Sequence, residues 1–140
     1  MIKTLALAFL PAMAQAGAWS DFETRCLSAL QNLTPPVVAG LGQGTREGDV
    51  TRYALSGGRE LIVDRAPGDG ISACAVRDPE NAPVPGFDDW IAGAVREGLY
   101  VPVVEGRWQS HLWIEPKLEV QKDSGAGGLM LRILETRLET

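Results

Sequence analysis

The sequence predicts an α+β domain, in which two helices cover one face of an antiparallel sheet of about six or seven strands. Two segments show helical spacing of apolar residues, and short alternating segments typical of strands follow each of them. The turns between these strands are too short for parallel crossovers, which favours antiparallel pairing. The expected order is α-βββ-α-βββ(β), with one disulfide.

Residues 1–16 have the pattern of an export signal. Lys3 gives a positive start, residues 4–10 are mostly apolar, and Ala14 and Ala16 form the small-x-small motif read by signal peptidases. The apolar stretch is far shorter than the ~20 residues that a membrane-spanning helix needs. We therefore expect a signal peptide over 1–16, a single globular α+β domain over 17–140 without a membrane span, and a periplasmic or secreted location.

The charge distribution argues against nucleic acid as a partner. The formal net charge is −5 at pH 7, and the lysines and arginines are scattered singly along the chain. Nucleic acids and anionic membranes attract clustered basic side chains, which this sequence lacks.

Cys26 and Cys74 are the two cysteines of the chain. In an exported protein an even number of cysteines favours disulfide formation, so we expect a Cys26–Cys74 bond. A catalytic cysteine acting with His111 is the alternative, and it requires a free thiolate beside the imidazole. Two cysteines and one histidine fall short of the four ligands of a structural zinc site, so we predict no metal.

The first half of the domain begins with a helix. Ser20 and Glu23 have the spacing of a capping box, which predicts a helix starting just after Ser20, and Pro35-Pro36 ends it. Residues 40–49 form a glycine-rich connector. Its Gly-x-Gly-x-Gly pattern resembles a dinucleotide-binding turn only superficially, because a strand pattern follows where a helix is required. Strands are expected over 50–55, 61–65 and 71–76, with turns at 56–58 and 67–70.

A second helix is expected to start at Asp88 as N-cap, with Phe87 packing onto its first turn, and to end at Gly98. Strands follow over 100–104, 107–115 and 117–122, with Pro116 at an edge or bulge. Residues 129–138 fit a strand or a helix, and we assign a strand because a hairpin onto residues 111–122 completes the sheet. Phe22 and Phe87 lie at similar places in the two helices, which is too little to establish a duplication.

Residues 107–115 alternate between two kinds of side chain. The set Trp108, Ser110, Leu112 and Ile114 looks core-facing, which places the other set on the opposite face of the sheet. Tryptophan combines a large apolar area with one hydrogen-bond donor, which suits recognition of a ligand or a protein. The predicted recognition surface therefore consists of Arg107, Gln109, His111 and Trp113.

These observations lead to the hypothesis of a non-catalytic periplasmic binding or interaction module, with an unknown protein or small ligand of the cell envelope as its partner. No serine-nucleophile motif and no converging carboxylates are present, so we predict no catalytic residue and no cofactor. A small periplasmic enzyme using His111 with a carboxylate is one alternative. An accessory subunit of an envelope complex is the other.

Overall fold

The computed structural model describes residues 17–65, 72–114 and 117–136. The predicted signal peptide, the turn at 67–70 and Pro116 lie outside these residues, as does the side chain of Trp113. The elements, in chain order, are α1 (Ala18–Phe22), a π-helical segment (Glu23–Leu27), α2 (Ser28–Gln31), β1 (Thr45–Glu47), β2 (Val50–Ala54), a 3₁₀ turn (Ser56–Gly58), β3 (Glu60–Arg65), β4 (Ser72–Asp78), α3 (Pro85–Arg96), β5 (Tyr100–Val104), β6 (Arg107–Ile114), β7 (Lys117–Gly125) and β8 (Gly128–Thr136).

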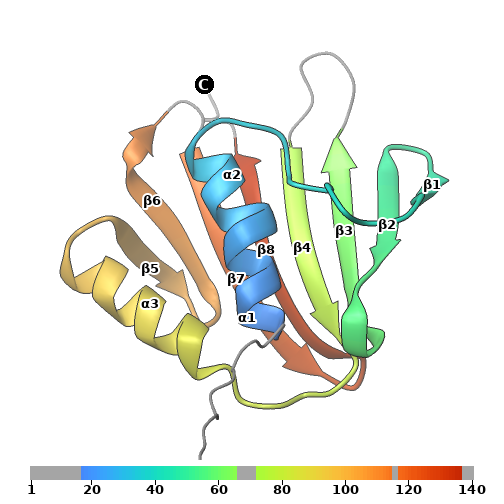
Figure 1. The fold of residues 1–140 in the computed structure, drawn as a ribbon. Coiled ribbons are helices and arrows are strands. Elements are labelled where there is room, and N and C mark those ends of the chain that lie inside the picture. The colour runs from blue at the N-terminus through green and yellow to red at the C-terminus, as the bar shows by residue number, and fades with distance from the viewer. Residues whose placement is uncertain (1–16, 66–71, 115–116, 137–140) are drawn as a thin grey trace, which may run out of the picture.

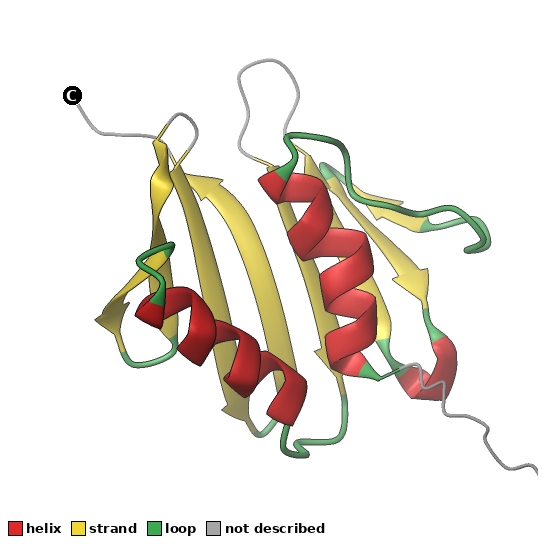
Figure 2. Cartoon of the chain, turned by 60° about the vertical axis from the view of Figure 1, so that its left-hand side comes forward, coloured by secondary structure: helices red, strands yellow, loops and turns green. Residues whose placement is uncertain are grey.

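The fold is an eight-stranded sheet in the order β1-β2-β3-β4-β8-β7-β6-β5, and every pair of neighbouring strands is antiparallel. The helix of residues 18–31 and helix α3 lie on the same side of this sheet (Figures 1 and 2). The predicted α+β class, the strand at β8 and the disulfide are confirmed. The predicted count of six or seven strands is wrong.

The additional strand is β1, which lies inside the segment predicted as a glycine-rich connector. Glu47 pairs with Val50, so Gly48 and Asp49 form a two-residue turn between β1 and β2. Gly48 has a φ of +61°, a conformation that glycine adopts without the steric cost of a side chain. The order is therefore α-ββββ-α-ββββ, with four strands in each half.

The two halves repeat one arrangement, a helix followed by four antiparallel strands, and they join where β4 pairs with β8 at the middle of the sheet. The register between β2 and β3 repeats between β6 and β7 with an offset of 57 residues (107 − 50): Val50–Asp64 corresponds to Arg107–Gln121, and Thr51–Val63 to Trp108–Val120. The last pair of strands in each half differs from this offset by two residues, since Val63 pairs with Cys74 and Val120 with Ile133. Phe22 and Phe87 also lie at similar places in the helices of the two halves, although they are 65 residues apart (87 − 22). Both rings are fully buried, and their centroids lie 6.3 Å apart between the two helices.

The core lies between the helices and the sheet. Leu61, Val76, Leu118, Leu131 and Ile133 are fully buried from four different strands. Aromatic side chains fill the space below the two helices in a connected series of ring contacts, made by Trp19, Phe22, Phe87, Trp90, Tyr100 and Trp108. Large rings bury much apolar area each, so this cluster links the two helices to one core.

Both helices begin earlier than predicted. The first starts at Ala18, so Ser20 lies inside its first turn and its carbonyl accepts a hydrogen bond from Thr24 Oγ1 (2.8 Å). The second starts at Pro85, a residue favoured at the first helical position, and Asp88 donates its N–H to the Val84 carbonyl. The predicted N-caps, Ser20 and Asp88, are therefore wrong. The helical conformation extends over Trp19 and Phe87, whose rings pack against each other in the core.

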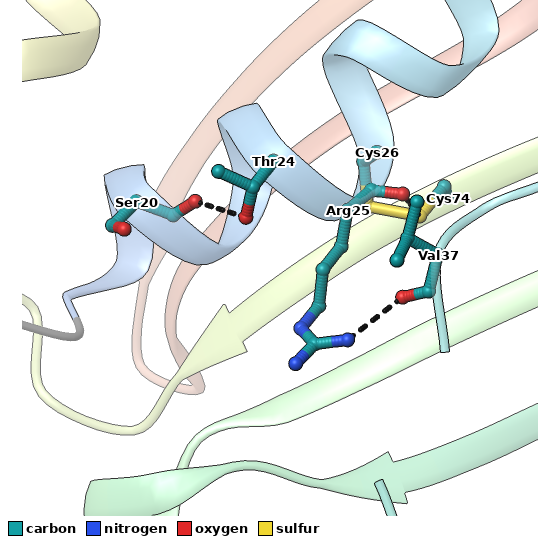
Figure 3. The surroundings of a disulfide bond; sticks show 6 residues. All are labelled: Ser20, Thr24, Arg25, Cys26, Val37 and Cys74. Atoms are coloured by element: carbon teal, nitrogen blue, oxygen red, sulfur yellow. Dashed lines mark hydrogen bonds between the residues drawn. A yellow bond between two sulfur atoms is a disulfide. The ribbon is translucent and has the colours of Figure 1, made fainter. Parts of the chain in front are cut away.

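The disulfide attaches the first helix to the centre of the sheet. Cys26 and Cys74 are both fully buried, with their Cα atoms 5.3 Å apart. Cys26 lies in the π-helical segment, where the Ser28 N–H reaches the Glu23 carbonyl five residues back. The neighbouring Arg25 holds the chain that leaves the helix: its carbonyl accepts the Val37 N–H (3.0 Å), and its guanidinium donates to the Val37 carbonyl (2.9 Å; Figure 3).

The first helix ends at Gln31, before Pro35-Pro36, as expected. Its final carbonyls are bonded by N–H groups of the residues that follow, Thr34 to Ala29 (2.9 Å) and Leu33 to Leu30 (3.0 Å). This is the Schellman arrangement, which requires a residue in the left-handed conformation. Leu33 occupies that position with a φ of +58°, although glycine is the residue usually found there.

Candidate functional site

The side of the sheet opposite the helices carries no helix or loop in the described part of the chain (Figure 2). We call this side the open face. Residues paired directly across antiparallel strands share a face, so the register defines the open face from one edge to the other. Its central members are Arg52, Ile62, Asp64, Ala73, Ala75, Arg77, Gln109, Glu119, Gln121, Asp123, Met130, Arg132 and Leu134.

The structure places three of the predicted recognition residues on this face. Arg107 pairs with Gln121 and Gln109 with Glu119, while His111 is exposed one alternation further along β6. Trp108 lies on the other face, where its ring packs against Phe87 at a centroid distance of 5.6 Å. Trp113 belongs to β6, but its side chain is not among those that the structure describes.

A bulge in β6 leaves the alternation at His111 intact. The register between β6 and β7 shifts between Gln109 and Ile114. The prediction that Ile114 faces the core is wrong, because beyond this shift its side chain is 55% exposed. The buried Ser110 replaces a ladder hydrogen bond at this shift. Its side-chain hydroxyl accepts the Leu118 N–H at 2.9 Å, a bond that a backbone carbonyl accepts in a regular sheet. His111 donates its backbone N–H to the Leu99 carbonyl (2.9 Å). Its side chain is exposed whereas that of Ser110 is buried, which is the alternation expected of a strand and places His111 on the same face as Gln109.

Polar side chains on β6, β7 and β8 form a chain of hydrogen bonds across the open face. Gln109 Nε2 donates to Glu119 Oε1 (3.2 Å), and Gln121 Nε2 donates to Glu119 Oε2. Arg132 Nη1 then donates to Gln121 Oε1 at 3.5 Å. Glu119 and Gln121 are 9% and 6% exposed, so these donors orient groups that are already largely shielded from water by their neighbours.

Beside this polar chain the open face is hollowed into a shallow basin of about 290 Å³. Ala73 and Ala75 form its floor, and both are small side chains in a strand where larger ones would fill the space. Two arginines and two aspartates surround the floor together with a few apolar groups; the charged residues are Arg52, Arg132, Asp64 and Asp123.

A second hollow, of about 410 Å³, lies on the helix side of the sheet at the edge formed by β1 and β2. Its outer wall is the strap, the segment 34–44 that follows the first helix, which contributes Pro35, Pro36 and Val38. Its inner wall comes from the sheet, with Arg46, Asp49, Thr51, Tyr53 and Val63. We call this hollow the strap pocket.

His111 lies at the surface, away from the polar chain of the open face. Its ring is exposed and hydrogen-bonds no carboxylate within the described ranges. In the same residues, no three His, Cys, Asp or Glu side chains come together in a way that could hold a metal ion. Nor does any helix among them have the length and apolar character needed to cross a membrane.

Sequence reasoning missed Glu119, Gln121 and Arg132. Their signal was present, because residues 117–122 alternate polar and apolar side chains as a half-exposed strand does. The strap pocket had no comparable signal, since one of its walls is the strap and the other comes from three strands that follow it in the chain. A comparison with protein-family models finds no match, and neither a curated protein nor a solved structure matches this chain.

Proposed function

We propose that this protein is an exported, non-catalytic interaction module that recognises a protein partner of the cell envelope through its open face. The observation that carries the proposal is the hydrogen-bonded chain from Gln109 to Arg132, which lies on a sheet face that no described element covers. A surface whose polar groups are held in place before binding loses little conformational entropy when a partner docks.

The composition of the open face suits a protein partner. Exposed arginines, a histidine and carboxylates surround a nearly buried polar centre, an arrangement that resembles a polar protein–protein contact. The basin is shallow and extends into a broad surface over several strands, whereas small-molecule sites enclose most of their ligand. The predicted export signal and the buried disulfide support a location in an oxidising compartment.

The neighbouring edge strand is poorly suited to receive a partner strand. Pro102 lies in the middle of β5, pairs with Trp108 and has no N–H to offer to an added strand. Pro102 is flanked by Val101 and Val103, which are both exposed. We therefore assign recognition to the face of the sheet rather than to its edge.

Two matched charge reversals test the proposal. Arg107→Glu changes an exposed side chain on the open face, and Arg96→Glu makes the same change on helix α3 on the opposite side. Each purified variant is used as bait in envelope extract of the native host, with Trp113→Ala as a third bait. Loss of one captured protein with Arg107→Glu and Trp113→Ala, but not with Arg96→Glu, is the expected result. Equal capture by all baits would refute the assignment.

A further inference from the structure

The internal repeat allows the strap pocket to be compared with its counterpart in the second half. Thr51 pairs with Val63 on the helix side of β2 and β3, and 57 residues later Trp108 pairs with Val120 on β6 and β7. Trp108 fills that counterpart position with an indole ring, which packs against Phe87 of α3. In the first half a threonine occupies the equivalent position, and a cavity of about 410 Å³ remains.

Hydrogen bonds hold the strap in place along the outer side of this cavity. The Arg25 guanidinium donates to the carbonyls of Val37 (2.9 Å) and Ala39 (3.1 Å), one on each side of Val38. Leu41 adds a turn by donating its N–H to the Val38 carbonyl (3.1 Å). Val38 is thereby held as a wall opposite Tyr53 of the sheet, and the disulfide at the next residue along the helix anchors Arg25 itself.

The chemistry of the walls indicates what the pocket accepts. Two prolines, two valines and the Tyr53 ring offer apolar and aromatic surface, and aromatic rings pack favourably against one another edge to face or offset. Arg46 and Asp49, one positive and one negative, lie at the β1–β2 turn that borders the pocket. Arg46 Nε is bonded to the Gly48 carbonyl (2.9 Å), which holds the side chain beside Asp49.

We propose that the strap pocket binds a small molecule that joins a planar aromatic ring to an ammonium and a carboxylate group, as free aromatic amino acids do. The ring lies among Val38 of the strap and Tyr53 and Val63 of the sheet, beside the point where Gly44 packs against Thr51. The carboxylate pairs with Arg46 and the ammonium with Asp49, so the ligand's charges complement those at the border of the pocket. This site is on the other side of the sheet from the open face and is independent of the proposed function.

Titration of the protein with free tryptophan, followed by amide chemical shifts in NMR, tests the site. We expect saturable shifts confined to the strap, β1, β2 and Val63, and weaker binding of indole, which has the ring without the charges. Alanine carries the charges without the ring and is expected not to bind. An absence of saturable shifts with tryptophan up to its solubility limit would overturn the proposal, and equal binding of indole would overturn the role given to Arg46 and Asp49.

Substitutions in the strap provide matched variants. Val38→Trp places an indole in the pocket and should weaken tryptophan binding at least tenfold, whereas Val37→Trp places the same side chain at an exposed strap position and should leave binding unchanged. Val38→Phe, which adds a smaller ring at the same wall, is the second blocking variant, should Val38→Trp not fold. Retained affinity in a folded blocking variant, as judged by its amide spectrum, would overturn the proposed position of the ring.

Discussion

At Gly86 in helix α3, an added methyl group is expected to disturb the packing against the first helix and so to lower the stability of the protein. It lies in the first turn of α3, and a Cβ built on it would be 2.3 Å from Cδ1 and 2.7 Å from Cγ of the Trp19 indole. Trp19 is held by three other rings, those of Phe22, Phe87 and Trp90, at centroid distances of 5.8–6.2 Å. The indole therefore has little freedom to move away.

Gly86→Ala should destabilise the protein although alanine is the better helix former. Overpacking of this kind costs about 1–3 kcal/mol, while the gain from replacing a helical glycine is about 0.5–1 kcal/mol. The expected net loss is on the order of 1 kcal/mol, which lowers the melting temperature by roughly 3–6 °C for a domain of this size.

Gly93→Ala is the matched control in the same helix. Its added Cβ meets only Arg96 Nη2, at 3.6 Å, so the substitution should raise stability through helix propensity alone. Chemical denaturation followed by tryptophan fluorescence measures both variants. Trp19→Ala should remove the penalty of Gly86→Ala in the double variant, because the clashing ring is then absent. If Gly86→Ala proves as stable as Gly93→Ala, the close contact with Trp19 does not constrain this helix.

Reducing the Cys26–Cys74 bond, which links residues 48 apart, should lower the free energy of unfolding by about 2–4 kcal/mol and lower the melting temperature. Thiols that react freely in the untreated native protein would contradict the bond. Leu33→Gly should stabilise the protein by about 1 kcal/mol, because glycine adopts the φ of +58° without steric cost and the 62% exposed Leu33 side chain loses little packing. A lower midpoint in denaturant would contradict this account. Burial raises the pKa of the Tyr100 phenol, which donates to Gln31 Oε1 (2.9 Å), so stability should fall as the pH rises above about 10, where the unfolded phenol ionises first. Tyr100→Phe should reduce that alkaline loss, and an unchanged pH profile would count against it. Finally, the intact mass of the protein isolated from its native host should lack residues 1–16, whereas a full-length mass in the envelope fraction would show that no cleavage occurs at Gly17.

Much of the sheet was predictable because the information for a strand is local. The alternation from Arg107 to His111 placed Trp108 toward the core and Gln109 toward the other face, and the structure has both as predicted. The assignment of residues 129–138 to a strand was likewise correct over β8, although it rested on the need to complete a sheet. A predicted export signal and two cysteines were enough to predict the disulfide.

The helix ends were not predictable in the same way. Ser20 and Asp88 are good capping residues, but packing of Trp19 and Phe87 into the shared core moved both helix starts toward the N-terminus. Burial of a large ring contributes about 1.5–3 kcal/mol, compared with about 1 kcal/mol for a cap. Where the two compete, tertiary packing decides.

The sequence by itself determined seven of the eight strands, the side of β6 that meets the core at Trp108, and the pairing of the cysteines. The tertiary structure alone decided that a polar segment at residues 45–47 becomes β1, that two halves of different sequence repeat one arrangement of elements, and that a pocket lies beside Thr51, the counterpart of Trp108. These features depend on contacts between segments far apart in the chain. Side-chain periodicity is a property of one segment and carries no information about which other segment will lie against it.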